Sequence, residues 1–121
     1  MNNKSKVLSC VAAAAFSLSV AGAAFAHHSF AMFDNSTTVK VSGSVDDFEW
    51  INPHVWLHIK TPDETGREFG WSFEAGSPGQ LGQSGWTPES VQVGDTIEVG
   101  FHPLKDGSNG GQLLELTKAG G

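Results

Sequence analysis

The sequence predicts a small all-β domain, and three observations carry this prediction. Apolar and polar residues alternate with a period of two in five separate segments, as expected for strands with one buried face. No stretch after residue 26 shows the 3.6-residue period of a long amphipathic helix. Clusters of turn-forming residues separate the segments, and 61–66 is the strongest of them.

The first predicted strand covers 39–50 and changes parity part-way along. Valines occupy odd positions up to Val45, whereas Phe48 and Trp50 occupy even positions. A one-residue slip of this kind is typical of a β-bulge, and Gly43 would ease a bend in so long a strand.

Three further strands alternate more simply. Their expected inward residues are Val55, Leu57 and Ile59 in the second, Phe69, Trp71 and Phe73 in the third, and Ile97, Val99 and Phe101 in the fourth. The turn at 61–66 should close a hairpin between the second and third strands. A short fifth strand is expected from Gln112 to Thr117.

The alternation stops between the third and fourth strands. Gly, Pro, Ser and Gln dominate residues 76–88, where 78–83 can form one short helical turn capped by Ser77. Five strands, a long bent first strand and an irregular connection after the third predict an OB-like Greek-key barrel over 38–118. A small β-sandwich is the competing architecture.

The first 26 residues have the pattern of a secretory signal peptide. Two lysines precede a mostly apolar run (7–20), and 24–26 shows the small-x-small pattern of a cleavage site. Cleavage there would make His27 the first residue of the mature protein and leave an extended segment, 27–37, ahead of the barrel. We therefore expect an exported protein, most simply a periplasmic one.

Composition argues against several classes of function. The net charge is −6 and becomes −8 once Lys4 and Lys6 leave with the signal peptide, which disfavours a nucleic-acid partner. The single cysteine, Cys10, lies in the signal segment, so the mature protein would have no disulfide and no thiolate ligand. No later stretch is long and apolar enough to span a bilayer. Without a phosphate-binding loop or a nucleophile elbow, we expect a protein that is not an enzyme.

Several short motifs together resemble one bacterial family, the exported domain-of-unknown-function family numbered 6152. The motifs are His27-His28-Ser29-Phe30, Phe33-Asp34, Trp50-x-Asn52-Pro53-His54-x-Trp56, Gly85-Trp86, Gly94-Asp95 and Asp106-Gly107-Ser108. The resemblance covers essentially all of the chain after the signal segment. It implies a small, exported, β-rich protein but no established activity. His27, His28 and His54 match the motifs, whereas His58 and His102 fall outside them.

The histidines suggest a transition-metal site. A free amine on His27 can chelate a metal ion together with its own Nδ1, as in a histidine brace. His28 offers a competing mode through the same amine, an amide and its own ring. With no cysteine available, the Irving–Williams order favours copper(II) among the metals that bind imidazole. Cleavage after Ala24 would instead put a histidine in third place, which suits a square-planar copper(II) or nickel(II) site.

A third nitrogen would come from the barrel. His54 opens the second strand and His102 closes the fourth, next to loops that share one mouth of an OB barrel. His58 lies four residues beyond His54, about 13 Å away, so these two share a face but cannot bind one ion without a bulge. We expect His54 to be the partner of His27, with His102 or His58 as substitutes.

Each of these residues also has a simpler structural interpretation. Strand histidines such as His58 and His102 are usually polar surface residues, and His54 can stabilise the turn at 52–54 through the backbone. Trp56 is expected on the same outward face, where OB folds often bind ligands by stacking. The alternative function is therefore a metal-free binding module for a peptide, glycan or partner protein. A structural role in an envelope complex is a third hypothesis.

Overall fold

A computed structural model of the protein describes residues 31–119 of the 121 in the chain. The predicted signal peptide and both amino-terminal histidines, His27 and His28, lie outside the described residues. From Phe33 onward the chain forms one compact unit. Its elements are β1 (Val39–Glu49), β2 (Trp56–Pro62), β3 (Glu68–Glu74), α2 (Pro78–Gln83), β4 (Thr96–Pro103) and β5 (Gly110–Lys118).

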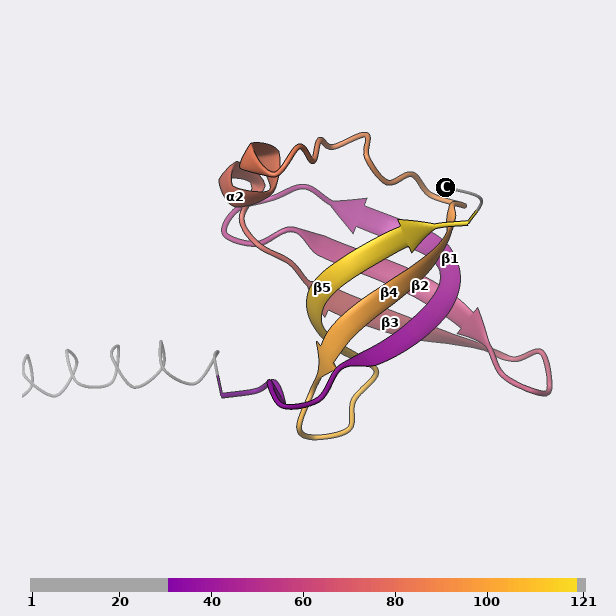
Figure 1. Cartoon of the computed structure of the whole chain (residues 1–121). Helices are drawn as coiled ribbons and strands as arrows, with labels where there is room; N and C mark the ends of the chain where they lie inside the picture. Colours follow the sequence, from indigo (N-terminus) through magenta and orange to yellow (C-terminus); the bar gives the residue numbers. More distant parts are fainter. Residues whose placement is uncertain (1–30, 120–121) are drawn as a thin grey trace, which may run out of the picture. The chain divides into compact units, whose positions relative to one another are not determined.

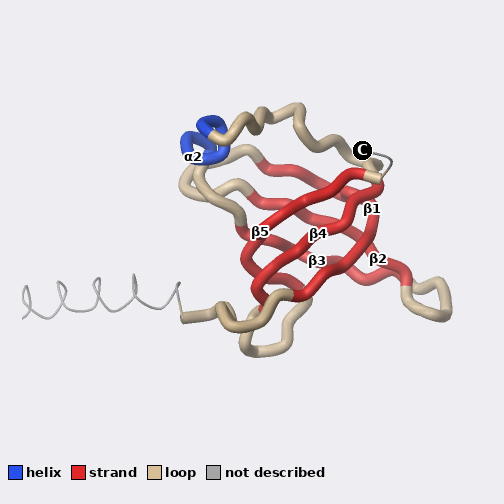
Figure 2. The backbone as a smooth tube through the Cα atoms, in the orientation of Figure 1, coloured by secondary structure: helices blue, strands red, loops and turns tan. Residues whose placement is uncertain are grey.

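The five strands close into a barrel in the order β1-β2-β3-β5-β4 (Figures 1 and 2). All neighbours are antiparallel except β3 and β5, which run parallel over three residue pairs. The curved β1 pairs with β4 through its first half and with β2 through its second half. The predicted five-stranded, OB-like barrel is therefore confirmed, and the chain does not form the alternative sandwich.

The predicted β-bulge lies in the middle of β1. The register with β2 shifts between Val45 and Asp47, so that Asp46 is the extra residue. Val45 points into the core before the shift, and Phe48 packs against the same core after it. The neighbours of Phe48, Asp47 and Glu49, are consequently turned to the outer face of the barrel.

A close approach between strands occurs where β1 passes from β4 to β2. A Cβ atom on Gly43 would collide with the carbonyl oxygen of Lys60, so this position needs a residue without a side chain. Gly43 was expected to ease a bend in the strand, and the structure shows that its lack of a side chain permits close contact with β2.

The core fills the barrel with side chains from four strands and one loop. Its buried members are Val45, Leu57, Ile59, Phe73, Val91, Ile97, Val99 and Phe101. The rings of Phe73 and Phe101 lie 4.8 Å apart between centroids. Full burial of a side chain of this size contributes about 1.5–3 kcal/mol to stability.

One expected core residue was assigned wrongly. Phe69 is 38% exposed, and the guanidinium of Arg67 lies 5.6 Å from the centre of its ring. Phe69 pairs with Thr61 near the tip of the β2–β3 hairpin, which extends beyond the barrel wall (Figure 1). The alternation of apolar and polar residues in β3 therefore extends into the tip of the hairpin, where the inward-facing side of the strand has no core to pack against.

The helix α2 has the predicted bounds and the predicted cap. The Ser77 hydroxyl accepts a hydrogen bond from the Gln80 backbone N–H, and the Gln80 side chain accepts one from the Ser77 N–H, both at 3.1 Å. This capping box, with Pro78 in the first turn, lets six residues form a helix that would otherwise be too short. Across residues 31–119, no helix has the length and apolar character needed to cross a membrane.

Candidate functional site

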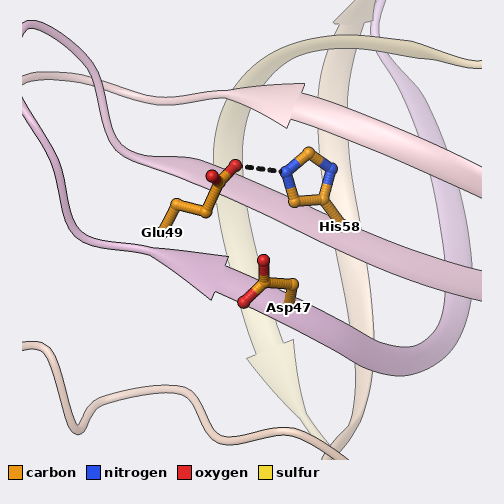
Figure 3. Close-up of side chains that lie close together, drawn as sticks. All are labelled: Asp47, Glu49 and His58. Atoms are coloured by element: carbon orange, nitrogen blue, oxygen red, sulfur yellow. Dashed lines mark hydrogen bonds and ion pairs between the residues drawn. The ribbon is translucent and has the colours of Figure 1, made fainter.

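Three ionisable side chains gather on the outer face of the barrel, where β1 runs beside β2 (Figure 3). They are Asp47, Glu49 and His58, which we call the outer-face cluster. One potential ligand atom from each lies within 4.8 Å of the other two. In the part of the chain that the structure describes, no other three His, Cys, Asp or Glu side chains come this close together.

The bulge in β1 and the register with β2 create this cluster. Asp47 and Glu49 are two residues apart after the shift, so their side chains leave the strand on the same face. Asp47 lies opposite His58, and Glu49 lies opposite Trp56. The bulge and the strand register together bring His58 beside the two carboxylates.

The ring of His58 is held from both sides. Its Nε2 lies 2.6 Å from Oε2 of Glu49, and its Nδ1 lies 2.8 Å from Oγ of Ser72 on β3. A carboxylate can only accept, so Nε2 donates to Glu49. When the ring carries a single proton, Nδ1 is the acceptor and the Ser72 hydroxyl donates to it. The indole of Trp56 is parallel to the imidazole within 6°, with 6.4 Å between centroids. These contacts fix the orientation of the ring.

A metal ion on Nε2 would find its supporting group already in place. With a metal on Nε2, the ring proton would lie on Nδ1, which could then donate a hydrogen bond to Oγ of Ser72. This arrangement of an anchored second nitrogen is usual for histidines that bind metals, because it sets the tautomer and the direction of the lone pair. Glu49 would exchange its hydrogen bond for a metal bond.

His54 and His102 lie elsewhere, and each is tied to the backbone. Nδ1 of His54 donates to the carbonyl of Ala75 at 3.0 Å, and Nδ1 of His102 donates to the carbonyl of Thr37 at 2.8 Å. His102 is paired with Gln112 on β5, whose other neighbour is Glu74 on β3. Neighbouring strands lie about 4.8 Å apart, so His102 on β4 is roughly 10 Å from β3, the strand beside His54. The structure does not bring the two histidines together.

Trp56 is half-buried on the outer face, as its parity suggested. It lies between Glu49 on β1 and Glu74 on β3, each of which is its direct partner in the sheet. Trp56 is therefore bordered by carboxylates on both sides and by His58 along its own strand.

Sequence reasoning missed four residues of this face, Asp47, Glu49, Ser72 and Glu74. The register of the β2–β3 hairpin could have identified Ser72 and Glu74 as neighbours of β2. The parity slip could have placed Asp47 and Glu49 on the outer face, but not opposite particular residues of β2.

The family model described as a family of unknown function, DUF6152, matches residues 14–113. The chain belongs to this family. The resemblance drawn from the motifs is thus confirmed for the DUF6152 protein, and the match spans both the outer-face cluster and His54. No curated protein shows significant similarity to it.

Two solved structures are similar to this DUF6152 protein. The mitochondrial single-stranded DNA-binding protein Rim1 of S. cerevisiae aligns with a TM-score of 0.52 at 12% identity, covering 69% of this chain and 93% of Rim1. A small single-stranded DNA-binding protein from Streptomyces coelicolor aligns with a TM-score of 0.43 at 15% identity, covering 68% and 90%. At these identities the first likeness supports the OB-like fold and nothing more.

Proposed function

We propose that this DUF6152 protein binds a divalent transition-metal ion on the outer face of its barrel, through Asp47, Glu49 and His58. The observation that carries the proposal is the mutual approach of their ligand atoms within 4.8 Å. Nitrogen and oxygen atoms bound to one such ion at about 2.1 Å lie at most about 4.2 Å from one another. Small side-chain rotations are therefore enough to complete the site.

The ligand types favour copper(II), zinc or nickel. An imidazole favours these ions over magnesium and calcium, which prefer all-oxygen sites. Two carboxylates balance the charge of a divalent ion, and the described residues include no thiolate that would favour copper(I). Among the divalent ions, copper(II) binds such ligand sets most tightly by the Irving–Williams order.

The exposure of the site favours capture and delivery over a structural role. The His58 and Glu49 side chains are 28% and 41% exposed, and three protein ligands leave at least one position open. An open, exposed site allows a second molecule to attack the ion directly. We therefore propose metal capture, buffering or transfer in the periplasm, without catalysis, and a metal-binding envelope protein as the recipient.

The same face argues against single-stranded DNA, the ligand of the structurally similar protein Rim1. Glu49 and Glu74 lie opposite Trp56, and Asp47 lies opposite His58, so three carboxylates border these two rings. A phosphate backbone would be repelled there, because nucleic-acid sites need cationic side chains.

The amino-terminal histidines remain part of the proposal. If the signal peptide is removed after Ala26, the amine and ring of His27 would give a second donor set, in which His28 competes or supports. Native mass spectrometry of the exported protein, with and without one equivalent of copper(II), tests this. A chain that starts at His27 and binds copper no more tightly than a form extended by one residue would contradict the terminal site.

The outer-face cluster is tested by replacing its histidine. Full-length protein recovered from the periplasm is titrated with copper(II) and zinc against a chromophoric chelator. His58→Ala should weaken binding by at least about tenfold, since even the loss of a supporting group costs about 10–100-fold. The matched control is His102→Ala, which removes another half-buried strand histidine tied through Nδ1 to a neighbouring segment. Equal affinities for both variants and the wild type would refute the site.

A second candidate is a metal-free binding module centred on Trp56. Its support is the half-buried indole between two carboxylates, which suits a cationic peptide group through ring and charge together. In that case Trp56→Ala would abolish binding of an arginine-rich peptide, and removing metal with a chelator would have no effect.

A further inference from the structure

A second pair of potential ligands lies where β2 begins and β3 ends, apart from the outer-face cluster. Nε2 of His54 faces Oε1 of Glu74 at 3.5 Å. The other ring nitrogen, Nδ1, lies 3.0 Å from the carbonyl oxygen of Ala75. A carbonyl can only accept a hydrogen bond, so Nδ1 must carry the ring proton.

This tautomer leaves two acceptors facing each other. With the ring proton on Nδ1, the lone pair of Nε2 faces the carboxylate of Glu74, so both atoms are available as metal ligands. Two ligands of one tetrahedral ion with bonds of about 2.1 Å lie about 3.4 Å apart. The observed separation of 3.5 Å matches this spacing.

The backbone holds this pair firmly in place. Val55 N–H donates to the carbonyl of Gly76 at 2.9 Å, and Ala75 N–H donates to the carbonyl of Val55 at 2.8 Å. Val55 is fully buried and Ala75 nearly so. His54 is therefore locked beside Glu74 by the residues that follow each of them.

We infer that His54 and Glu74 form a second metal half-site, which takes the same class of divalent transition ion as the outer-face cluster. The inference rests on the proposed function for the class of metal but on different residues. The two side chains are 47% and 24% exposed, so water or a donor from another molecule completes the coordination. The site also gives a role to the histidine of the Trp50-x-Asn52-Pro53-His54-x-Trp56 motif.

The two sites hold separate ions. His54 and His58 are four residues apart, or about 13 Å along β2. Trp56 lies between them, with Glu49 and Glu74 as its two partners in the sheet. Glu49 of one site and Glu74 of the other therefore both lie beside Trp56. The fluorescence of Trp56 should consequently respond to metal binding at either site.

The test is the metal stoichiometry of the full chain and its variants. Native mass spectrometry and copper(II) titration of the full chain carrying His27→Ala and His28→Ala, which remove the proposed terminal ligands, should give two equivalents from residues of the barrel. His54→Ala and Glu74→Gln should each lose one equivalent, and His58→Ala should lose the other. Glu68→Gln, an exposed carboxylate on the same strand, is the control and should keep both. Circular dichroism confirms that each variant is folded.

The outcomes separate the two proposals. Two equivalents that survive both His54→Ala and Glu74→Gln would overturn the half-site, as would a single equivalent that only His58→Ala removes. A single equivalent removed by His54→Ala and Glu74→Gln but kept by His58→Ala would support the half-site and refute the outer-face cluster. The Trp56→Phe variant should bind the same number of copper(II) ions, but most of the quenching of tryptophan fluorescence by copper(II) should be lost.

A second readout does not depend on counting ions. In ¹⁵N-labelled protein at neutral pH, zinc should shift the Nε2 resonance of His54 while Nδ1 keeps its proton. An imidazolium signal from His54 that zinc leaves unchanged would show that a proton, and not a metal, lies between the ring and Glu74.

Discussion

Ser72 gives His58 its orientation without contacting the ion itself. Its hydroxyl lies 2.8 Å from Nδ1, on the side of the ring opposite Glu49. When Nε2 binds a metal, the hydroxyl would accept a hydrogen bond from Nδ1–H, so Ser72 acts as a positioning residue.

Replacing Ser72 by alanine should weaken metal binding at the outer-face cluster by about tenfold or more. The fold should change little, because one hydrogen bond of this kind contributes about 1 kcal/mol. Competition with a chromophoric chelator measures the affinity, and Ser44→Ala, which removes an exposed hydroxyl on β1, is the control. The same loss in both variants would mean that Ser72 has no particular role.

The residue scale is also where the sequence was least informative. Histidines can be picked out by type, but their partners depend on register. The Ala75 carbonyl that fixes His54, and the Ser72 hydroxyl that fixes His58, lie 21 and 14 residues away along the chain. The residues next to each histidine in the sequence do not indicate these partners.

Strands and turns were predicted far better, because their signals are local. The parity slip identified the bulge in β1, and the cap residue Ser77 identified α2 with its bounds. Phe69 shows the limit of this reasoning, since alternation says which face a side chain takes but not whether a core lies there. The register between β1 and β2 depends on the bulge and on the connecting loop together, so Asp47 and His58 could not be paired beforehand.

The turn before β4 makes stability depend on pH. The Asp95 carboxylate accepts a hydrogen bond from the Gln92 N–H at 3.0 Å and lies 3.3 Å from Nζ of Lys118. The Gln92 hydrogen bond, helped by Lys118, lowers the pKa of Asp95 in the folded protein. A lowered pKa means that the stabilisation is present above the ordinary carboxyl pKa and is lost as the pH falls through the folded-state value.

Asp95→Asn should therefore be less stable than the wild type at neutral pH, and the difference should shrink in acid. Urea unfolding at a series of pH values measures it, with the gap expected to close below about pH 3.9. A gap that stays constant across this range would show that the charge of Asp95 contributes nothing to folding.

At the scale of the whole molecule, one small core carries the stability. Phe73 is fully buried and packs against Phe101 with 4.8 Å between ring centroids. Phe73→Ala should cost about 3–5 kcal/mol, a large part of the 5–15 kcal/mol typical of a domain. Thermal unfolding should show a lower Tm, whereas Val93→Ala, at a 70% exposed position, should leave it unchanged.

Metal binding should raise that stability by an amount that grows with the logarithm of the free metal concentration divided by Kd. A ligand that binds only the folded state adds about 2.7 kcal/mol at a free concentration of 100 times its Kd. Copper(II) or zinc should therefore increase the Tm of the wild type, and the increase should be smaller in His58→Ala. A Tm that is indifferent to metal in both proteins would contradict binding to the folded barrel.

The bulge in β1 has a consequence for how relatives of this protein can vary. If Asp46 were deleted, every later residue of β1 would move to the opposite face of the strand. Without it, Phe48 would face water and two carboxylates would enter the core. Substitutions can thus change the metal ligands one at a time. Inserting or deleting one residue in β1 would instead remove both Asp47 and Glu49 from the outer face. The spacing between Val45 and Phe48 is accordingly the feature to compare among relatives, ahead of the identity of any single ligand.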